Sequence, residues 1–377
     1  MKTEKTSRFV RLCETTSPTG EERAVADLVT RELQALGLEV TEDGAAGTTI
    51  AGAGNLLARI PGAPKADGED PGYLMFCAHL DTVPHDGPIE VILDENGIYR
   101  SAGPTILGAD NKAAVAVLIE LAVRAVSNPP PVGIELLFTV AEEQGLIGAG
   151  AFDQSQLLSK VGFVLDHATD VGEVITSAPT HIGIEARFAG VEAHAGLMPE
   201  AGRSAIVAAA RAVSEMKTGR IDEGTTANIG VINGGTSGNV VPGACYLAGE
   251  ARSLDPVRVT EVIAGMTDQM VWAASEAGCE VDIATRKHFT GYHVDDESAA
   301  LRLAEAALAV TGHEPRRIST GGGSDANVFR ERGMDCLLLA NGTYDNHTHQ
   351  ESVPRRNLGA MLAVCEEIVQ QAGNQPC

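Results

Sequence analysis

Short apolar runs alternate with longer stretches of helical spacing along most of the chain. Continuous apolar runs stand at 55–60, 73–78, 134–141, 161–165 and 335–340. Because polar residues do not alternate within them, these runs predict strands that are buried on both faces. Helical spacing predicts two helices within 8–36, broken at residues 17–20 (SPTG), and another at 113–126. Strands that alternate with helices predict an α/β fold with a mostly parallel sheet and helices on both faces.

Polar side chains suited to chemistry follow several of the predicted strands. The strands concerned are 73–78, 134–141, 161–165, 316–320 and 335–340. The residues that follow them are His79 and Asp81, Glu142 and Glu143, Asp166, the segment 321–325 (GGGSD), and His347. In parallel sheets, ligands bind beyond the carboxyl ends of the strands. We therefore expect these side chains, although distant in sequence, to meet at one edge of the sheet.

The middle third of the chain follows a different pattern. It predicts strand 181–189, helix 203–216, strands 225–233 and 243–253, helix 256–277 and strand 279–290. This β-α-β-β-α-β order is the ferredoxin-like split motif. Because strand-end motifs resume after it, we expect residues 180–291 to form a domain inserted into a larger domain of residues 1–179 and 292–377, which carries those motifs.

Composition and charge narrow the classes of protein. The 377 residues suggest two or three domains. The net charge of −23 argues against nucleic acid and anionic membranes as partners, since both attract clustered Lys and Arg. Apolar runs stay shorter than the ~20 residues of a membrane span, and the polar N-terminus lacks the apolar core of a secretory signal. Seven scattered cysteines without a C-x-x-C pattern favour a cytoplasmic location.

Imidazoles and carboxylates at the predicted strand ends are suited to bind zinc. The candidate metal ligands are His79, Asp110, Glu143, Asp166 and His347. Five ligands are too many for one tetrahedral catalytic site. They suit two metals that share one bridging carboxylate and a bridging water, whose pKa both metals lower. We therefore expect two Zn²⁺ per subunit, with Mn²⁺ or Co²⁺ as substitutes.

Two further acids, Asp81 and Glu142, stand beside these candidates in the sequence. Asp81 follows His79 by two residues, so on an extended backbone it could accept the other imidazole N–H. Glu142 and Glu143 are adjacent, so one could ligate a metal while the other acts as general base. Purely structural roles for these acids remain open. Asp81 could be a turn residue, Asp110 an N-cap of helix 113–126, and the two glutamates a solvated turn.

Four motifs together resemble one enzyme family. They are HLDTVP at 79–84, GADNK at 108–112, AEE at 141–143, and His347 four residues before Glu351. In this order they resemble the co-catalytic di-zinc exopeptidases, which include peptidase T, carboxypeptidase G, aminoacylase and succinyl-diaminopimelate desuccinylase. Length and spacing are closest to peptidase T-like proteins. The resemblance covers nearly the whole chain and implies that 180–291 is a dimerisation or lid domain, hence a homodimer.

The resemblance implies a role for each metal ligand. Asp110 would bridge the two metals. His79 and Asp166 would complete one site, and Glu143 and His347 the other. The position four residues before a glutamate selects His347 rather than His349 as the family's ligand.

The same resemblance assigns roles to the residues beside the ligands. Glu142 is implied as the proton shuttle, which takes a proton from the bridging water and returns it to the leaving amine. Asp81 is implied to orient His79, and the peptide bond before Asn111 is implied to be cis.

The resemblance also implies lid and substrate-binding residues, most of them in the inserted domain. The segment 190–196 (GVEAHAG) resembles the family's lid loop, whose histidine, here His194, would stabilise the oxyanion in the partner subunit's site. Asn228, Arg252, Gly323 and Ser324 resemble substrate-binding positions. A plain loop role for His194, and a surface ion pair for Arg252, are the alternatives.

Asp166 indicates the substrate branch within the family. Carboxypeptidase-like and deacylase members tend to have Glu there, whereas aminopeptidases and dipeptidases have Asp. The resemblance thus implies that the N-terminal peptide bond of short peptides is hydrolysed, as by a tripeptide aminopeptidase, with a metal-bridging water activated by Glu142. An N-acyl amino acid amidohydrolase (deacylase) or carboxypeptidase on the same di-zinc site is the alternative. A non-catalytic binding relative is a remote one.

Overall fold

Contacts within the chain divide it into two compact units. The computed structural model describes residues 7–64 and 71–374, so residues 1–6 of the polar N-terminus and Cys377 lie outside the described ranges. The first unit comprises Met1–Thr176, His293–Ser319 and Ser324–Cys377, and the second comprises Ser177–Tyr292 and Thr320–Gly323. The second unit therefore differs from the expected 180–291 mainly by the separate segment Thr320–Gly323.

Two contacts account for this separate segment. The Arg252 guanidinium donates a hydrogen bond to the Gly321 carbonyl at 3.3 Å. Gly323 lies against the ring of Phe289, and a Cβ at this position would overlap the ring. Glycine is therefore required at 323 by close packing as well as by its place in a loop.

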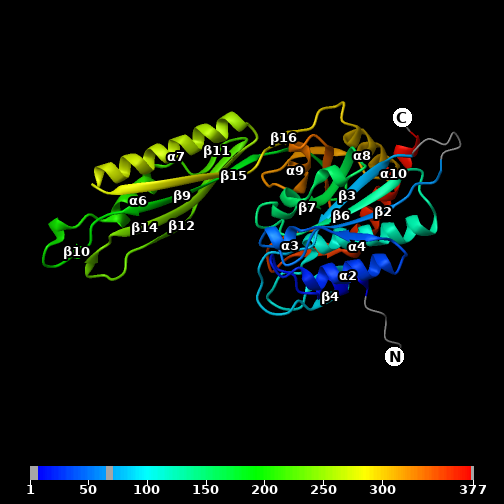
Figure 1. Ribbon diagram of the computed structural model, residues 1–377, viewed down its shortest axis with the longest axis horizontal. Helices are drawn as coiled ribbons and strands as arrows, with labels where there is room; N and C mark the ends of the chain where they lie inside the picture. The colour runs from blue at the N-terminus through cyan, green and yellow to red at the C-terminus, as the bar shows by residue number, and fades with distance from the viewer. Residues whose placement is uncertain (1–6, 65–70, 375–377) are drawn as a thin grey trace. The chain divides into compact units, whose positions relative to one another are not determined.

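The first unit contains a large mixed sheet whose central strands are parallel (Figure 1). Its strand order is β1-β2-β6-β3-β7-β18-β8-β16. The bounds are β1 Val40–Glu42, β2 Leu56–Ile60, β3 Tyr73–His79, β6 Gly133–Thr139, β7 Val161–His167, β8 Glu173–Ala178, β16 Tyr292–His293 and β18 Asp335–Ala340. Strands β6, β3, β7 and β18 pair in parallel, whereas β2 and β8 join them antiparallel. The parallel strands are almost entirely buried, which explains their unbroken apolar sequences.

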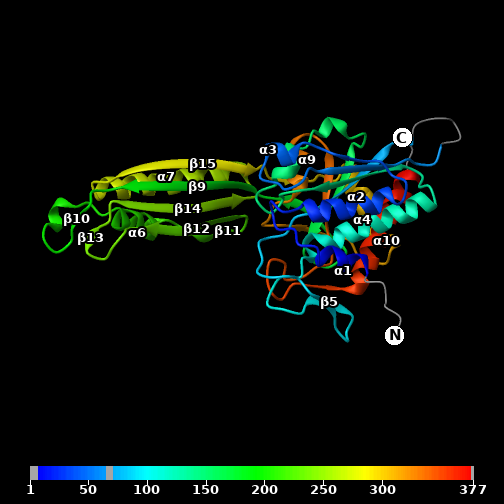
Figure 2. The same ribbon diagram turned by 60° about the horizontal axis from the view of Figure 1, so that its bottom comes forward.

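Helices cover both sides of this sheet. Their bounds are α1 Arg8–Cys13, α2 Arg23–Gln34, α3 Ala45–Thr48, α4 Ala109–Ser127, α5 Ile147–Ala151, α8 Ala299–Val310, α9 Asp325–Glu331 and α10 Arg355–Asn374, with a 3-10 turn at Gln154–Gln156. Helix α9 lies on one side, and α2, α4 and α10 lie on the other (Figure 2). The bounds of α4 begin four residues before the expected 113–126, but Asp110 and Asn111 have non-helical backbone angles that kink this first part, so the regular helix begins after them.

The expected strand 316–320 does not belong to the buried parallel set. Strand β17 (Arg316–Ser319) is mostly exposed and pairs only with β8, off the main strand order. The physical reason is its two arginines, since Arg316 pairs with Glu173 and Arg317 with Glu305 at the surface. A further small sheet, β4 Val91–Leu93, β5 Ile98–Ser101 and β19 Ser352–Pro354, is absent from the sequence-based expectation.

The second unit has the ferredoxin-like arrangement and one additional edge strand. Its antiparallel sheet has the order β11-β12-β14-β9-β15. The bounds are β9 Thr180–Ala189, α6 Ala205–Glu215, β11 Gly219–Asp222, β12 Thr225–Gly234, β14 Ala244–Ser253, α7 Pro256–Glu276 and β15 Glu280–Phe289, with a small pair β10 Ala193–His194 and β13 Val240–Val241, and a 3-10 turn Pro199–Ala201. The strand β11 lacks an apolar run, so the sequence pattern did not indicate it.

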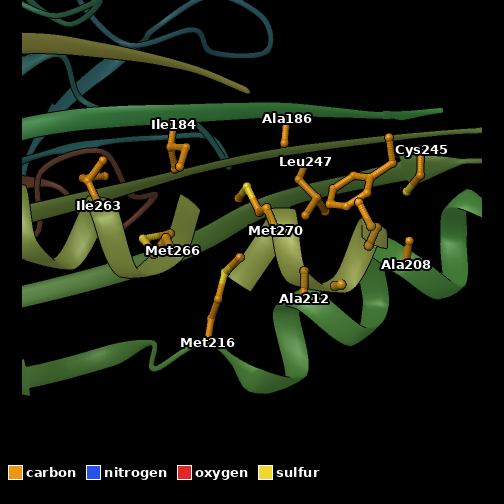
Figure 3. Close-up of a cluster of buried hydrophobic side chains, with 14 of the residues drawn as sticks. Ile184, Ala186, Ala208, Ala212, Met216, Cys245, Leu247, Ile263, Met266 and Met270 are labelled. Atoms are coloured by element: carbon orange, nitrogen blue, oxygen red, sulfur yellow. The ribbon is translucent and has the colours of Figure 1, made fainter. Parts of the chain in front are cut away.

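Both helices of the second unit cover one face of its sheet. Figure 3 shows side chains from α6 and α7 meeting those of the strands in a single apolar layer. Small residues such as Ala208 and Ala212 let α6 approach closely, and the flexible side chains of Met266 and Met270 fill the remaining space. Alternating burial along β9 matches its alternating sequence.

Two observations concern the whole described chain. None of the helices within residues 7–64 and 71–374 has the length and apolarity needed to cross a membrane. The six described cysteines are free thiols, and five of them are buried.

Candidate metal centre

Strand ends and turns of the first unit bring the five predicted metal ligands together. His79 is the last residue of β3, and Asp166 is the penultimate residue of β7. Glu143 follows β6, which pairs in parallel with β3, so the carboxyl ends of these two strands lie side by side. Asp110 opens helix α4, and His347 lies in the turn between β18 and β19. The carboxyl edge of the sheet therefore gathers residues from nearly the whole length of the chain.

Asp110 presents one carboxylate oxygen to each of two imidazoles. Its Oδ1 lies 3.2 Å from Nε2 of His79, and its Oδ2 lies 3.1 Å from Nε2 of His347. The same Nε2 of His347 lies 3.0 Å from Oε1 of Glu143. Nε2 of His79 lies 3.3 Å from Oδ1 of Asp166. The arrangement consists of two imidazole–carboxylate pairs that share Asp110, as a bridging ligand would require.

Glu142 lies within the same cluster. Ligand atoms of His79, Glu142 and Asp166 all lie within 4.8 Å of one another, as do those of His79, Asp110 and Glu143. Distance alone therefore makes Glu142 a potential ligand as well as a potential base. The hydrogen bonds distinguish the two glutamates, because Glu143 contacts His347 directly.

Burial and the nearby negative charges raise the pKa values of two acids in this cluster. Burial raises the pKa of Asp166 to about 8, against the opposing effect of His79. Burial and the nearby Asp166 charge raise the pKa of Glu142 well above its usual value. The carboxylates are thus held where water solvates them poorly and where added positive charge would stabilise their ionised forms.

For Asp110 and His347, the pKa shifts favour the charged forms instead. Although burial opposes it, hydrogen bonding to His347 and His79 lowers the pKa of Asp110. Hydrogen bonds to Asp110 and Glu143 raise the pKa of His347 to about 10. Both shifts reflect attraction between carboxylates and positive charge, which a bound metal would also supply.

Asp81 makes different contacts from those expected. The nearest partner of His79 Nδ1 is the main-chain carbonyl of Asp81 at 3.0 Å, and the Asp81 carboxylate is 3.5 Å away. That carboxylate instead accepts the main-chain N–H groups of Glu142 at 3.0 Å and Glu143 at 3.2 Å, and the Thr19 hydroxyl at 2.7 Å. Asp81 thus contacts His79 mainly through its main-chain carbonyl. Its side chain instead holds the turn that contains Glu142 and Glu143.

Glu22 supports the same turn and was not identified from the sequence. Its Oε1 accepts the Ala141 N–H at 3.2 Å, and its Oε2 accepts the Gly52 N–H at 2.6 Å. Ala141 has φ +50°, a left-handed conformation that few residues other than glycine adopt. A sequence signal for this role exists, because Glu22 precedes helix α2 directly and stands one turn before the buried Ala26, in line with the apolar face of the helix.

Asn111 and Asp325 are two further buried residues beside the cluster. The side-chain amide of Asn111 donates to Oδ1 of Asp166 at 3.0 Å and to the Leu165 carbonyl at 2.8 Å. The bond between Asp110 and Asn111 is cis, as the family resemblance implies. Asp325 accepts the Thr139 hydroxyl at 2.5 Å, and burial raises the pKa of its carboxyl to about 6. The segment GGGSD thus reaches the sheet edge through its final residue.

The predicted lid and substrate residues belong mostly to the second unit. His194 is exposed in β10, where its Nδ1 accepts the Gly196 N–H at 3.2 Å. Asn228 is exposed on β12. The Arg252 guanidinium holds both carboxylate oxygens of Glu250, at 2.9 and 3.1 Å.

The last two predicted positions lie on either side of a unit boundary. Gly323 ends the short segment that belongs to the second unit. Ser324 belongs to the first unit, is fully buried, and stands at the N-terminus of α9. Its main-chain N–H donates to Oδ1 of Asn327 at 3.1 Å.

Comparison with known families identifies two segments. Residues 55–183 match the model of peptidase family M28, and residues 177–277 match that of a peptidase dimerisation domain. The second match lies entirely within the second compact unit.

Several similar proteins match the chain over most of its length. The uncharacterised protein YqjE of Bacillus subtilis is 36% identical over 366 residues, which are 97% of each chain. A tripeptidase structure from Staphylococcus aureus is 34% identical, covers 98% of this chain and 97% of its own, and has a TM-score of 0.90. Aminopeptidase PepT from Bacillus cereus is 35% identical, covers 97% and 96%, and has a TM-score of 0.84.

Fold and similarity together define a metallopeptidase, and the described site gathers imidazole and carboxylate groups that could hold metal ions. The fold also matches a dinuclear metal-binding peptidase of the M20 family from Bacillus subtilis, at 16% identity and a TM-score of 0.73. The chain belongs to the co-catalytic metallo-exopeptidase family that includes peptidase T.

Proposed function

We propose that this protein is a di-zinc aminopeptidase that removes the N-terminal residue of short peptides, tripeptides among them. The observation that carries the proposal is Asp110, whose two carboxylate oxygens face the imidazoles of His79 and His347. Similarity to a tripeptidase and to PepT, at 34% and 35% identity, supports the choice of substrate class.

The residues of the cluster fit a pair of divalent cations. Asp110 would be shared, His79 and Asp166 would complete one site, and Glu143 and His347 the other. Imidazole and carboxylate donors suit zinc, with manganese or cobalt as substitutes. The raised pKa of Asp166 reflects a buried acid that lacks sufficient positive charge nearby. When bound, two such ions polarise a substrate carbonyl and increase the acidity of water.

Glu142 is the proposed proton carrier. It would accept a proton from the attacking water and deliver it to the amine nitrogen as the peptide C–N bond breaks. Its burial and raised pKa suit a carboxyl group that must hold a proton during part of the reaction. Asp81 and Glu22 fix the main chain on which Glu142 stands.

The second unit is the proposed lid and dimerisation domain. The dimerisation-domain match over 177–277 supports a homodimer through residues 180–291. We place His194 as an oxyanion donor to the partner subunit, and Asn228, Arg252, Gly323 and Ser324 at substrate positions. Sedimentation at several concentrations tests the assembly, since a constant monomer mass of 39.2 kDa would contradict it. A cytoplasmic location is proposed from the cysteine usage.

A paired assay tests the substrate class. Zinc-loaded protein is given trialanine or N-acetyl-trialanine, and products are read by mass spectrometry beside a chelator-treated control. We expect loss of the N-terminal alanine from trialanine only, and no cleavage after chelation. Cleavage that persists in the chelated sample would contradict the metal mechanism.

A deacylase is the second candidate function. The acetylornithine deacetylase of Myxococcus xanthus is 27% identical over 324 residues, 79% of each chain. The same assay separates the two, because a deacylase would release acetate from N-acetyl-trialanine and leave trialanine intact.

A further inference from the structure

A buried carboxylate outside the ligand set contacts the turn that carries Asp110. Glu351 is only 2% exposed. Its Oε1 accepts the N–H of Asp110 at 2.8 Å, and its Oε2 accepts those of Leu107 and Gly108, each at 2.8 Å. These three hydrogen bonds to one side chain hold the main chain around Asp110 in place.

This turn presents main-chain N–H groups that need acceptors. Gly108 has φ +71°, so the chain passes through the left-handed region two residues before Asp110. The first N–H groups of a helix also lack partners within the helix. Glu351 supplies acceptors for these N–H groups from a point 241 residues further along the chain.

Glu351 also belongs to the turn that carries His347. The chain from Tyr344 to Ser352 is closed by two main-chain hydrogen bonds of 2.9 and 3.0 Å, and Glu351 N–H donates to the Thr348 carbonyl at 3.2 Å. Within this turn His347 has φ +63°, again left-handed. One residue thus connects the turn of the shared carboxylate with the turn of an imidazole that faces it.

We propose that Glu351 is a positioning residue that sets Asp110 and His347 relative to each other, and thereby sets the affinity of the metal site they share. Glu351 itself does not ligate, since both of its oxygens are engaged by main-chain N–H groups. The inference rests on the proposed di-metal centre and deepens it.

The test compares two buried glutamates that make the same kind of contact. Glu351→Gln replaces one acceptor oxygen by a donor amide, which cannot accept the main-chain N–H groups it meets. Glu135→Gln is the matched control. Glu135 is fully buried and accepts the N–H groups of Leu158 at 3.0 Å and Ser159 at 2.9 Å. It lies near the beginning of β6, whereas Glu142 follows the end of that strand.

Zinc binding is measured by isothermal titration calorimetry on chelator-stripped full-length protein. We expect two zinc ions per chain in the wild type. In Glu351→Gln we expect one of the two affinities to fall by roughly 10- to 100-fold, the usual effect of removing a residue that orients a ligand. In Glu135→Gln both affinities should stay within about twofold of the wild type, whatever its loss of stability.

Thermal unfolding with and without zinc separates positioning from a merely structural role. Ligand binding raises stability in proportion to the logarithm of its affinity. The zinc-induced rise in Tm should therefore shrink in Glu351→Gln and stay unchanged in Glu135→Gln. Equal affinities and an equal rise in Glu351→Gln and the wild type would overturn the inference.

Two further readouts keep the outcomes distinct. Fewer than two zinc ions bound by the wild type would refute the di-metal centre itself, before any variant is compared. If Glu351→Gln does not fold, hydrogen exchange of the wild-type segment 105–112 decides instead. Strong protection in zinc-free protein is expected from the three hydrogen bonds, and exchange at the rate of an open loop would overturn the inference.

Discussion

The two units differ most in where they bury charge. Among the described residues of the second unit, the buried polar side chains are Thr180, Thr225 and Ser253, and none is charged. The first unit buries several charged side chains, namely Glu22, Asp81, Lys112, Glu135, Glu142, Asp325 and Glu351. Burying a charge is costly unless hydrogen bonds or opposite charges compensate it. The first unit thus buries charged side chains that a purely apolar core would not contain, and several of them lie at the candidate site.

Backbone conformation separates the units in the same way. The described non-glycine residues with positive φ are Ala141, Leu146, Asp345 and His347, and all belong to the first unit. Three of them stand beside or within the metal-ligand set. Such conformations persist where surrounding contacts over-determine them, and they collect at functional sites. An apolar layer is enough to form a fold, whereas this site also needs acceptors placed against its turns.

The largest expected effect is on Glu142, the acid placed nearest to the chemistry. Glu142→Gln keeps the shape but cannot carry a proton, so kcat should fall on the order of 10³-fold. Zinc content should stay at two per chain, as measured by elemental analysis. A drop to one zinc ion would instead make Glu142 a ligand, which its distance to His79 and Asp166 would permit.

A substitution in the second unit should affect stability alone. Met270 is fully buried in the apolar layer, so Met270→Ala should lower the free energy of unfolding by about 2–5 kcal/mol. Zinc stoichiometry should not change. Asp268→Ala, at an exposed position of the same helix, is the control and should stay within about 0.5 kcal/mol of the wild type. Loss of zinc from the Met270 variant at temperatures where it is folded would break the division between the units.

Glu22 provides a sharper test within the first unit. Glu22→Gln weakens the hydrogen bond from the Ala141 N–H, which helps to fix the turn that carries Glu142. We therefore expect kcat to fall roughly tenfold while both zinc ions remain bound. Its exposed neighbour is the matched control, and Glu21→Gln should keep the wild-type kcat. Equal kcat values for the two variants would show that the turn holds its shape without Glu22.

The smallest expected effect concerns acid stability in the second unit. A hydrogen bond to His181 and the ion pair with Arg252 lower the pKa of Glu250, against burial, from 4.5 to about 2. Its contribution to stability is therefore complete above pH 4.5 and is lost as the pH falls toward 2. Because the side chain is 35% exposed, screening limits the effect to about 1 kcal/mol. Urea unfolding at pH 6 and pH 3 should show a smaller pH-dependent loss in Glu250→Gln than in the wild type.

The same difference explains what the sequence could predict. In the second unit, alternation and helical spacing placed helix 256–277 and strand 225–233 within a residue of the observed Pro256–Glu276 and Thr225–Gly234. Such patterns are local, so one sequence contains them. In the first unit, the apolar strands and their polar ends likewise indicated where the candidate ligands would gather.

The supporting residues of the site escaped the same reasoning. The partners of Glu22 and Glu351 are main-chain N–H groups 119 and 241 residues away. Every residue except proline has such a group, so no side-chain type marks the pairing. Strand β17 shows the converse error, because 316–320 was expected among the strands of the parallel sheet, whereas it is mostly exposed and pairs only with β8.

The separation of Asp110 and His347 by 237 residues has a consequence for biosynthesis. A ribosome delivers the chain from its N-terminus, and domains generally fold as they emerge. The whole of Ser177–Tyr292 is released before His347 is even translated. A nascent or truncated chain can therefore complete its inserted unit while the metal centre still lacks an imidazole and the Glu351 brace. Hydrolytic capacity would arise only after His347 has been added to the chain, so a chain that stops before this residue would be inactive.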